Sequence, residues 1–252
     1  MESISPDYVK KKYEPIVRGG INEWPVVALS RNRDEFIEEV ARESIKRIKL
    51  QASSRDALME ELETTVFREK LRVKRNPWAV DPEDDGDFLK SVKERLLQIS
   101  QSNNNEEKDQ KLDEILEEIV IRYASEIAGN FKKSRYRMAR SIVTFGFARL
   151  LNASRARGFW SIFSTQYTLQ DKINITGEVD QLRKLAKKGT IVMVPTHFSN
   201  LDSILIGWVI NVLGLPAFIY GAGLNLFNIK VISYFLNSLG AYKVDRRKKN
   251  LL

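Results

Sequence analysis

Residues 191–213 read IVMVPTHFSNLDSILIGWVINVL and hold the pattern that decides the fold. The short apolar run 191–194 is typical of a buried strand, and the apolar segment Leu201–Leu213 predicts a helix. Between them lies His197, the only histidine of the chain, and Asp202 follows it five residues later. The stretch therefore predicts a strand, a turn that carries polar side chains, and a helix.

Strand and helix patterns alternate on both sides of this stretch. The expected elements are a strand at 172–176, a helix at 178–188, the strand at 191–194, the helix at 201–213, a strand at 217–220, a helix at 228–239 and a strand at 241–244. This alternation favours an α/β layer in which helices cover parallel strands. So few strands make a small sheet, and we expect further sheet after Leu252.

The first half of the chain shows helical periodicity instead. Apolar residues recur at helical spacing in segments 33–50 and 55–72, in a third segment that Asp81-Pro82 would begin, and in a fourth that starts near Glu106 and ends at Gly129-Asn130. Four amphipathic helices joined by short polar breaks predict a bundle. We therefore divide the chain into a helical region at 1–165 and an α/β region at 166–252.

Composition excludes several kinds of site. The chain has 252 residues, of which 43% are hydrophobic and 29% charged, as expected for a folded protein. Because it has no cysteine, disulfides, thiolate metal sites and a cysteine nucleophile are excluded. With a single histidine as well, we expect no metal site.

The net charge of +8 favours anionic partners, which include phosphorylated metabolites, nucleic acid and acidic membrane surfaces. A merely basic cytoplasmic protein is an equal alternative on charge alone. No nucleic-acid motif is present, and we expect no nucleic-acid partner. The basic and apolar stretch 132–140 fits a membrane-contacting helix, but we favour a helix whose apolar face packs on the core.

One apolar stretch, 203–224, is long enough to span a bilayer. Asn211, Gly214 and Pro216 interrupt it, which favours a buried helix, a turn and a strand instead. The N-terminus has no apolar segment of the secretory kind, and we expect a cytoplasmic protein.

The polar residues after the strand at 191–194 are suited to proton transfer. A neutral imidazole such as His197 removes protons near neutral pH, and a carboxylate such as Asp202 fixes its tautomer. Ser199 or Asn200 can cap the following helix, whose N-terminus favours Asp202 and any nearby anion. A histidine that only packs at a strand end is the alternative.

A second motif, GAYKVDRR at 240–247, also forms a strand that ends in cations. Arginine at the end of a strand can bind phosphate through paired N–H groups. A solvated basic run is the alternative on charge pattern alone.

Together, VPTHFSNLDS at 194–203 and GAYKVDRRKKN at 240–250 resemble two motif blocks of the glycerolipid acyltransferase family. This family acylates glycerol-3-phosphate and 1-acylglycerol-3-phosphate, and the resemblance covers 172–250. It implies an incomplete α/β acyltransferase-like sheet at 166–252, preceded by an N-terminal α-helical bundle domain.

The resemblance also implies roles for individual residues. His197 would be the general base and Asp202 would orient it. Arg246 would bind the acceptor's phosphate with Lys243 or Arg247, and Ser199 and Asn200 would also contact substrate. The acyl donor would be acyl-CoA or acyl-carrier protein, without a cofactor. Such an O-acyltransferase in phospholipid synthesis would work peripherally on an anionic membrane surface.

The chain departs from the family pattern in two respects. Thr196 precedes the histidine where many relatives have asparagine. The family's third block, which is Pro-Glu-Gly-Thr-Arg-like or Pro-Gly-Gly-Thr-Arg-like, and its fourth block would both lie beyond Leu252. We therefore expect an N-terminal piece of such an enzyme. A non-catalytic or truncated protein that binds anionic membranes is the alternative.

Overall fold

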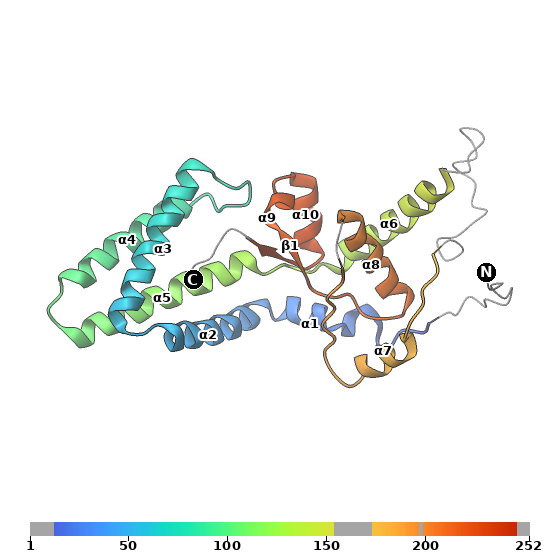
Figure 1. Cartoon of the computed structure of the whole chain (residues 1–252), viewed down its shortest axis with the longest axis horizontal. Coiled ribbons are helices and arrows are strands. Elements are labelled where there is room, and N and C mark those ends of the chain that lie inside the picture. Colours follow the sequence, from blue (N-terminus) through green and yellow to red (C-terminus); the bar gives the residue numbers. More distant parts are fainter. Residues whose placement is uncertain (1–12, 154–172, 197–198, 246–252) are drawn as a thin grey trace. The chain divides into compact units, whose positions relative to one another are not determined.

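The computed structural model describes residues 13–153, 173–196 and 199–245 (Figure 1). The described part is mostly helical and contains one two-stranded sheet. The chain divides into two compact units. The first unit comprises Met1–Ala28 and Lys132–Phe218, and the second comprises Leu29–Phe131 and Ile219–Leu252. The division expected at residue 165 falls outside the described ranges and stays a prediction.

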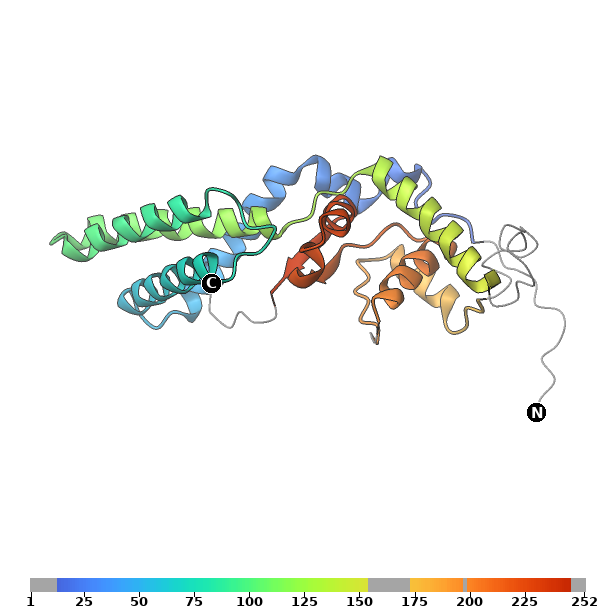
Figure 2. The same cartoon turned by 90° about the horizontal axis from the view of Figure 1, so that it is seen from above.

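Four long helices form the main body of the second unit (Figure 2). They are α2 (Arg33–Gln51), α3 (Arg55–Arg75), α4 (Asp85–Gln101) and α5 (Asn105–Ile127). Helix α2 packs against α5, and α3 packs against α4. On each helix, apolar residues recur every three or four positions and so lie on one face. These faces pack together in one shared core, which contains Ala41, Ile48, Leu58, Leu62, Val66, Leu89, Val92, Leu96, Ile99, Leu112, Ile115, Leu116, Ile119 and Val120. The four helices expected from the sequence are therefore present.

The start of α4 differs from the expectation that Asp81-Pro82 would begin it. Asp81 instead closes a turn, because its carboxylate accepts the Trp78 N–H at 2.6 Å and its own N–H donates to the Trp78 carbonyl at 3.1 Å. The same carboxylate pairs with Arg72 at 2.7 Å. These bonds hold Asp81 outside the helix, which begins at Asp85 with Asp84 as its N-cap residue.

The sheet of the second unit joins the end of α5. Strand β1 (Tyr220–Gly223) runs parallel to β2 (Ala241–Val244), and α9 (Leu224–Phe227) and α10 (Lys230–Ser238) connect them. The parallel pairing was expected, although β1 begins three residues later than predicted. The Asn130 N–H, just after α5, donates to the Asn237 carbonyl at 3.0 Å. This bond ties the segment after α5 to the last turn of α10, just before β2.

The first unit contains α6 (Lys133–Ala153), α7 (Val179–Ala186) and α8 (Asn200–Val212), together with the short helix η1 (Gly20–Glu23). Helix α1 (Pro25–Arg31) follows η1 along the chain. Arg140 on α6 donates to the Asn211 side chain on α8 at 3.1 Å. Helix α8 ends before Gly214, whose φ of 66° makes the expected turn. Among the described residues, no helix combines the length and apolar character needed to cross a bilayer.

Two strands expected in the first unit do not form. Residues 173–176 and 190–196 have no ladder partner. Val192 and Val194 are 82% and 88% exposed, whereas Ile191 and Met193 are half-buried. A strand's N–H and C=O groups require a neighbouring strand, and alternating burial alone does not supply one.

Candidate functional site

The first motif lies at the start of α8, where Ser199 is the N-cap residue. Its backbone is extended, and its Oγ accepts the Leu201 N–H at 3.1 Å. In return, the Asp202 carboxylate accepts the Ser199 N–H through Oδ2 at 2.7 Å. These reciprocal bonds form a capping box, which satisfies N–H groups that the first helical turn leaves without partners. Of the two expected cap residues, Ser199 fills the role, and Asn200 is the first residue of the helix.

The capping box gives Asp202 a fixed place for its charge. A carboxylate in the first turn lies at the positive end of the helix dipole, which favours the ionised form. The bond to Ser199 restrains that carboxylate against the chain just C-terminal to His197. His197 itself lies outside the described residues, and its pairing with Asp202 stays a prediction.

The segment before His197 has a strand-like backbone without a strand's partner. Met193 packs in the core around Ile210, Leu213 and Leu215, while the neighbouring valines point into solvent. The expectation that His197 follows the carboxyl end of a strand is therefore not met in this structure. What anchors the motif is the capped helix that comes after it.

The second motif begins with a glycine whose role is structural. Gly240 has a φ of 81°, a left-handed conformation that residues with a Cβ rarely adopt. Gly129, just after α5, approaches the same turn so closely that a Cβ there would lie 2.5 Å from the Ala241 carbonyl oxygen. Ala241 is fully buried. The turn into β2 is therefore held by backbone contact with the end of α5.

Lys243 lies on β2 and is half-buried. Burial lowers the pKa of Lys243, the nearby carboxylates of Glu126 and Asp81 act in the opposite direction, and Arg33 lowers it further. Among the described residues, no carboxylate lies within ion-pair distance of its ammonium group. Such a cation is suited to an anionic ligand. Arg246 and Arg247 lie outside the described residues.

The two motifs belong to different compact units. Asp202 and Ser199 are in the first unit, and Lys243 is in the second. Each motif is therefore described by itself, and the predicted meeting of His197 with the cations after β2 stays a prediction.

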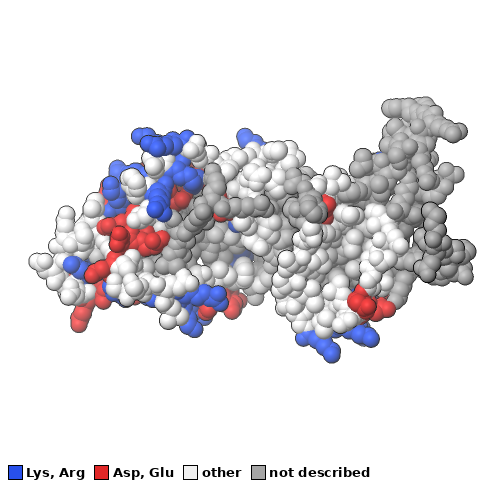
Figure 3. Space-filling view, viewed as in Figure 1, with Lys and Arg blue, Asp and Glu red and all other residues white. Residues whose placement is uncertain are grey.

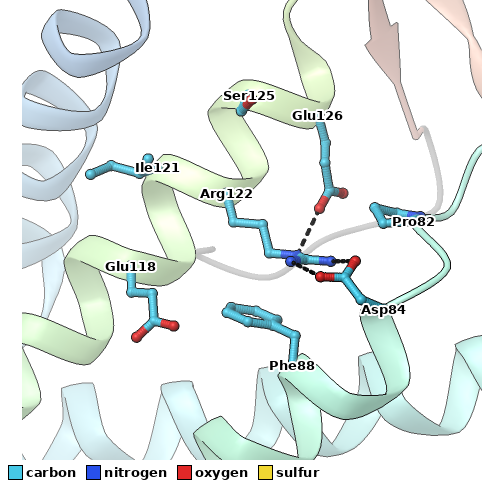
Figure 4. Close-up of a pocket in the computed structure, with 8 residues that line it drawn as sticks. All are labelled: Pro82, Asp84, Phe88, Glu118, Ile121, Arg122, Ser125 and Glu126. Atoms are coloured by element: carbon cyan, nitrogen blue, oxygen red, sulfur yellow. Dashed lines mark hydrogen bonds and ion pairs between the residues drawn. The ribbon is translucent and has the colours of Figure 1, made fainter. Parts of the chain in front are cut away.

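A pocket of about 560 Å³ in the second unit contains ion pairs that the sequence did not indicate (Figure 4). Arg122 donates to Asp84 at 2.9 Å and to Asp85 at 2.7 Å, and pairs with Glu126 at 3.0 Å. Its guanidinium also lies 4.3 Å from the centre of the Phe88 ring. The hydrogen bond from Arg122 lowers the pKa of Asp84. One guanidinium thus faces three carboxylates, and its bonds to Asp84 and Asp85 link the start of α4 to the end of α5.

No metal centre is found within the described ranges, since no three His, Cys, Asp or Glu side chains there converge suitably.

The ion cluster around Arg122 had only one sequence signal, the acidic run 83–85, and that run is equally typical of a helix start.

Part of the chain matches a known protein family. Residues 176–251 match the family model described as Acyltransferase. No curated protein and no solved structure matches the chain. The matched range takes in both the capped motif around Asp202 and the strand motif around Lys243. The match of residues 176–251 to this family is consistent with the resemblance to the glycerolipid acyltransferases.

Proposed function

We propose that the protein transfers an acyl group from acyl-CoA or acyl-carrier protein to a hydroxyl of glycerol-3-phosphate or 1-acylglycerol-3-phosphate. One observation carries this proposal: the acyltransferase match spans both motif blocks in their expected order. The acylated product partitions into a bilayer. The proposal therefore includes a cytoplasmic, peripheral place on an anionic membrane surface.

The proposed reaction needs one base and no covalent enzyme intermediate. His197 takes the proton of the acceptor hydroxyl, while Asp202 orients the imidazole and stabilises its charged form. The oxygen attacks the thioester carbonyl, a C–O bond forms, and the C–S bond breaks. The leaving thiolate takes the proton back from His197, which restores the base.

The acceptor's phosphate would be held by cations. Arg246 is the proposed principal contact, with Lys243 or Arg247 beside it. The lowered pKa of half-buried Lys243 supports this role, since a phosphate would compensate a charge that burial disfavours. Ser199 and Asn200, at the positive end of α8, are proposed as further substrate contacts.

The test is an acyl-transfer assay on the full chain with labelled acyl-CoA or acyl-carrier protein and either acceptor. We expect His197→Ala to lower the rate by roughly 10²–10⁴-fold, as for loss of a general base. Asp202→Asn separates two roles, because an amide oxygen still accepts the Ser199 N–H but carries no charge. We expect it to reduce the rate while α8 stays folded.

Asp56→Asn is the matched control, since Asp56 also lies in the first turn of a serine-capped helix, α3. It should leave the rate unchanged. A His197→Ala variant as active as the unsubstituted chain would refute the proposed base. A chain that transfers no acyl group from any of these donors would favour the non-catalytic alternative.

A further inference from the structure

The excess of positive over negative charge in the protein lies in one stretch of its sequence. Residues 127–170 contain eight basic residues and no acidic one. The chain has 41 basic and 33 acidic residues, so the remainder holds 33 of each and is neutral. Figure 3 agrees with this balance, because acidic and basic side chains interleave over the helical region on the face it shows. Most of the described part of this stretch is α6.

Helix α6 packs through the face that carries Tyr136 and Arg140. Tyr136 meets the Trp24 ring edge-on at 5.2 Å, and Arg140 binds Asn211 of α8. At about 100° per residue, half-buried Val143 lies on this same face. The packing predicted for the basic stretch 132–140 is therefore present on this side of the helix.

The opposite face carries an exposed apolar ridge. Met138, Ile142 and Phe145 follow one another at intervals of four and three residues, which aligns them on one side of the helix. They are 37%, 56% and 56% exposed. A soluble helix ordinarily turns such a stripe toward the core, and a contiguous exposed stripe marks a contact surface.

Cationic side chains accompany this ridge. The Arg149 guanidinium lies 4.6 Å from the centre of the Phe145 ring, and Arg137 is exposed on the neighbouring turn. Long basic side chains can lay their apolar stems along such a ridge while the charge reaches the surrounding water or headgroups. Apolar side chains flanked by cations, with no acidic residue along the helix, fit an anionic bilayer interface.

We propose that this face of α6, formed by Met138, Ile142 and Phe145 with Arg137 and Arg149, docks on the surface of an anionic bilayer. Charge complementarity selects this occupant. Nucleic acid would form ion pairs with the arginines but would leave the apolar ridge exposed to water. An uncharged membrane would bury the ridge but would offer the arginines no anionic partner. The inference deepens the peripheral membrane location included in the proposed function by naming the surface that makes the contact, and vesicle binding tests it separately from acyl transfer.

The test is co-sedimentation of the full chain with vesicles of phosphatidylglycerol mixed into phosphatidylcholine, at low and high salt. We expect Ile142→Glu/Phe145→Glu to weaken binding at least tenfold. Arg137→Glu should weaken it less and reduce its salt dependence. The control Leu50→Glu/Phe67→Glu alters side chains that are 76% and 64% exposed on the helical region, and it should bind normally.

Circular dichroism checks that each variant is folded. Should the glutamate pair unfold the chain, Ile142→Gln/Phe145→Gln replaces it and should weaken binding in the same direction. Ile142→Leu/Phe145→Leu should bind normally. Four results would overturn the proposal. They are undiminished vesicle binding by the glutamate or glutamine pair, equal binding to pure phosphatidylcholine, preferential binding to duplex nucleic acid over vesicles, and self-association of the chain that the glutamate pair abolishes while vesicle binding is unchanged.

Discussion

The bundle of helices α2 to α5 (residues 33–127) and the described part of the acyltransferase-matched segment (residues 176–245) differ in how their structure is held. In the bundle, each helix makes its backbone hydrogen bonds within itself, and the four helices share one core. In the acyltransferase segment, the two strands have only four residues each, and 190–196 is extended without a partner. The segment that carries the two motifs therefore has shorter paired elements and more unpaired backbone than the helical bundle.

This difference follows from where backbone partners come from. A helical N–H finds its acceptor four residues back, whereas a strand's partner comes from a distant part of the chain. Val192 and Val194 therefore remain exposed on a segment that has no ladder partner among the described residues. The motif around Asp202 is held by a local cap, and the motif around Lys243 is held by contact with the end of α5.

The largest test of this comparison is in the helical core. Leu116 is fully buried, and Leu116→Ala should lower the free energy of unfolding by roughly 2–5 kcal/mol through lost burial and a cavity. Urea denaturation followed by circular dichroism measures it. Leu50→Ala, at a side chain that is 76% exposed, should change it by under about 0.5 kcal/mol. Equal effects of the two substitutions would contradict the shared core.

The contact between α5 and β2 provides the next test. Gly129→Ala would place a Cβ 2.5 Å from the Ala241 carbonyl oxygen, which should cost roughly 1–3 kcal/mol of unfolding free energy. Gly86→Ala is the control, because a Cβ at this helical position meets nothing within 4 Å. It should stabilise the protein by about 0.5–1 kcal/mol. A harmless Gly129→Ala would show that α5 does not constrain the turn before β2.

The same difference explains what could be predicted from the sequence. Helices α2, α3 and α5 lie where periodicity placed them, and β2 coincides with its predicted range. The late start of α4 escaped prediction because the turn at Asp81 depends on Arg72, a partner from another element. The prediction of a strand at 191–194 was wrong for a related reason, since its own residues do not determine whether a neighbouring strand is present to pair with it.

The candidate site was predictable to a similar degree. The cap by Ser199 follows from local sequence, and the structure confirms it. The half-burial of Lys243 beside Glu126 and Asp81 could not be foreseen, because those carboxylates come from α5 and from the turn before α4, far away in the chain. Local chemistry was therefore accessible to sequence reasoning, and the environment of Lys243 was not.

A pair of serine caps compares the two regions directly. Ser54→Ala in α3 and Ser199→Ala in α8 each remove one side-chain acceptor and should cost about 1 kcal/mol locally. We expect the Ser54 substitution to lower the free energy of global unfolding. The Ser199 substitution should instead raise amide exchange in α8 about fivefold without shifting the global transition. A matching global loss in both variants would show that α8 unfolds together with the helical bundle.

The smallest expected effect concerns Lys243. Because burial lowers its pKa, the unfolded chain binds more protons than the folded one as pH approaches the ordinary value of about 10.5. The contribution of Lys243 to the free energy of unfolding should therefore rise with pH in the window below that value, and the difference between the unsubstituted chain and Lys243→Met measures it.

Near neutral pH, Lys243→Met should stabilise the chain by no more than about 0.5 kcal/mol, measured by urea denaturation. Lys230→Met, at an exposed lysine on α10, is the control and should leave the pH dependence intact. If Lys243→Met instead destabilises the chain strongly, Lys243 is a structural counter-charge for Glu126 and Asp81. If the variant is more stable but binds glycerol-3-phosphate more weakly, the charge of Lys243 serves ligand binding and lowers the stability of the chain.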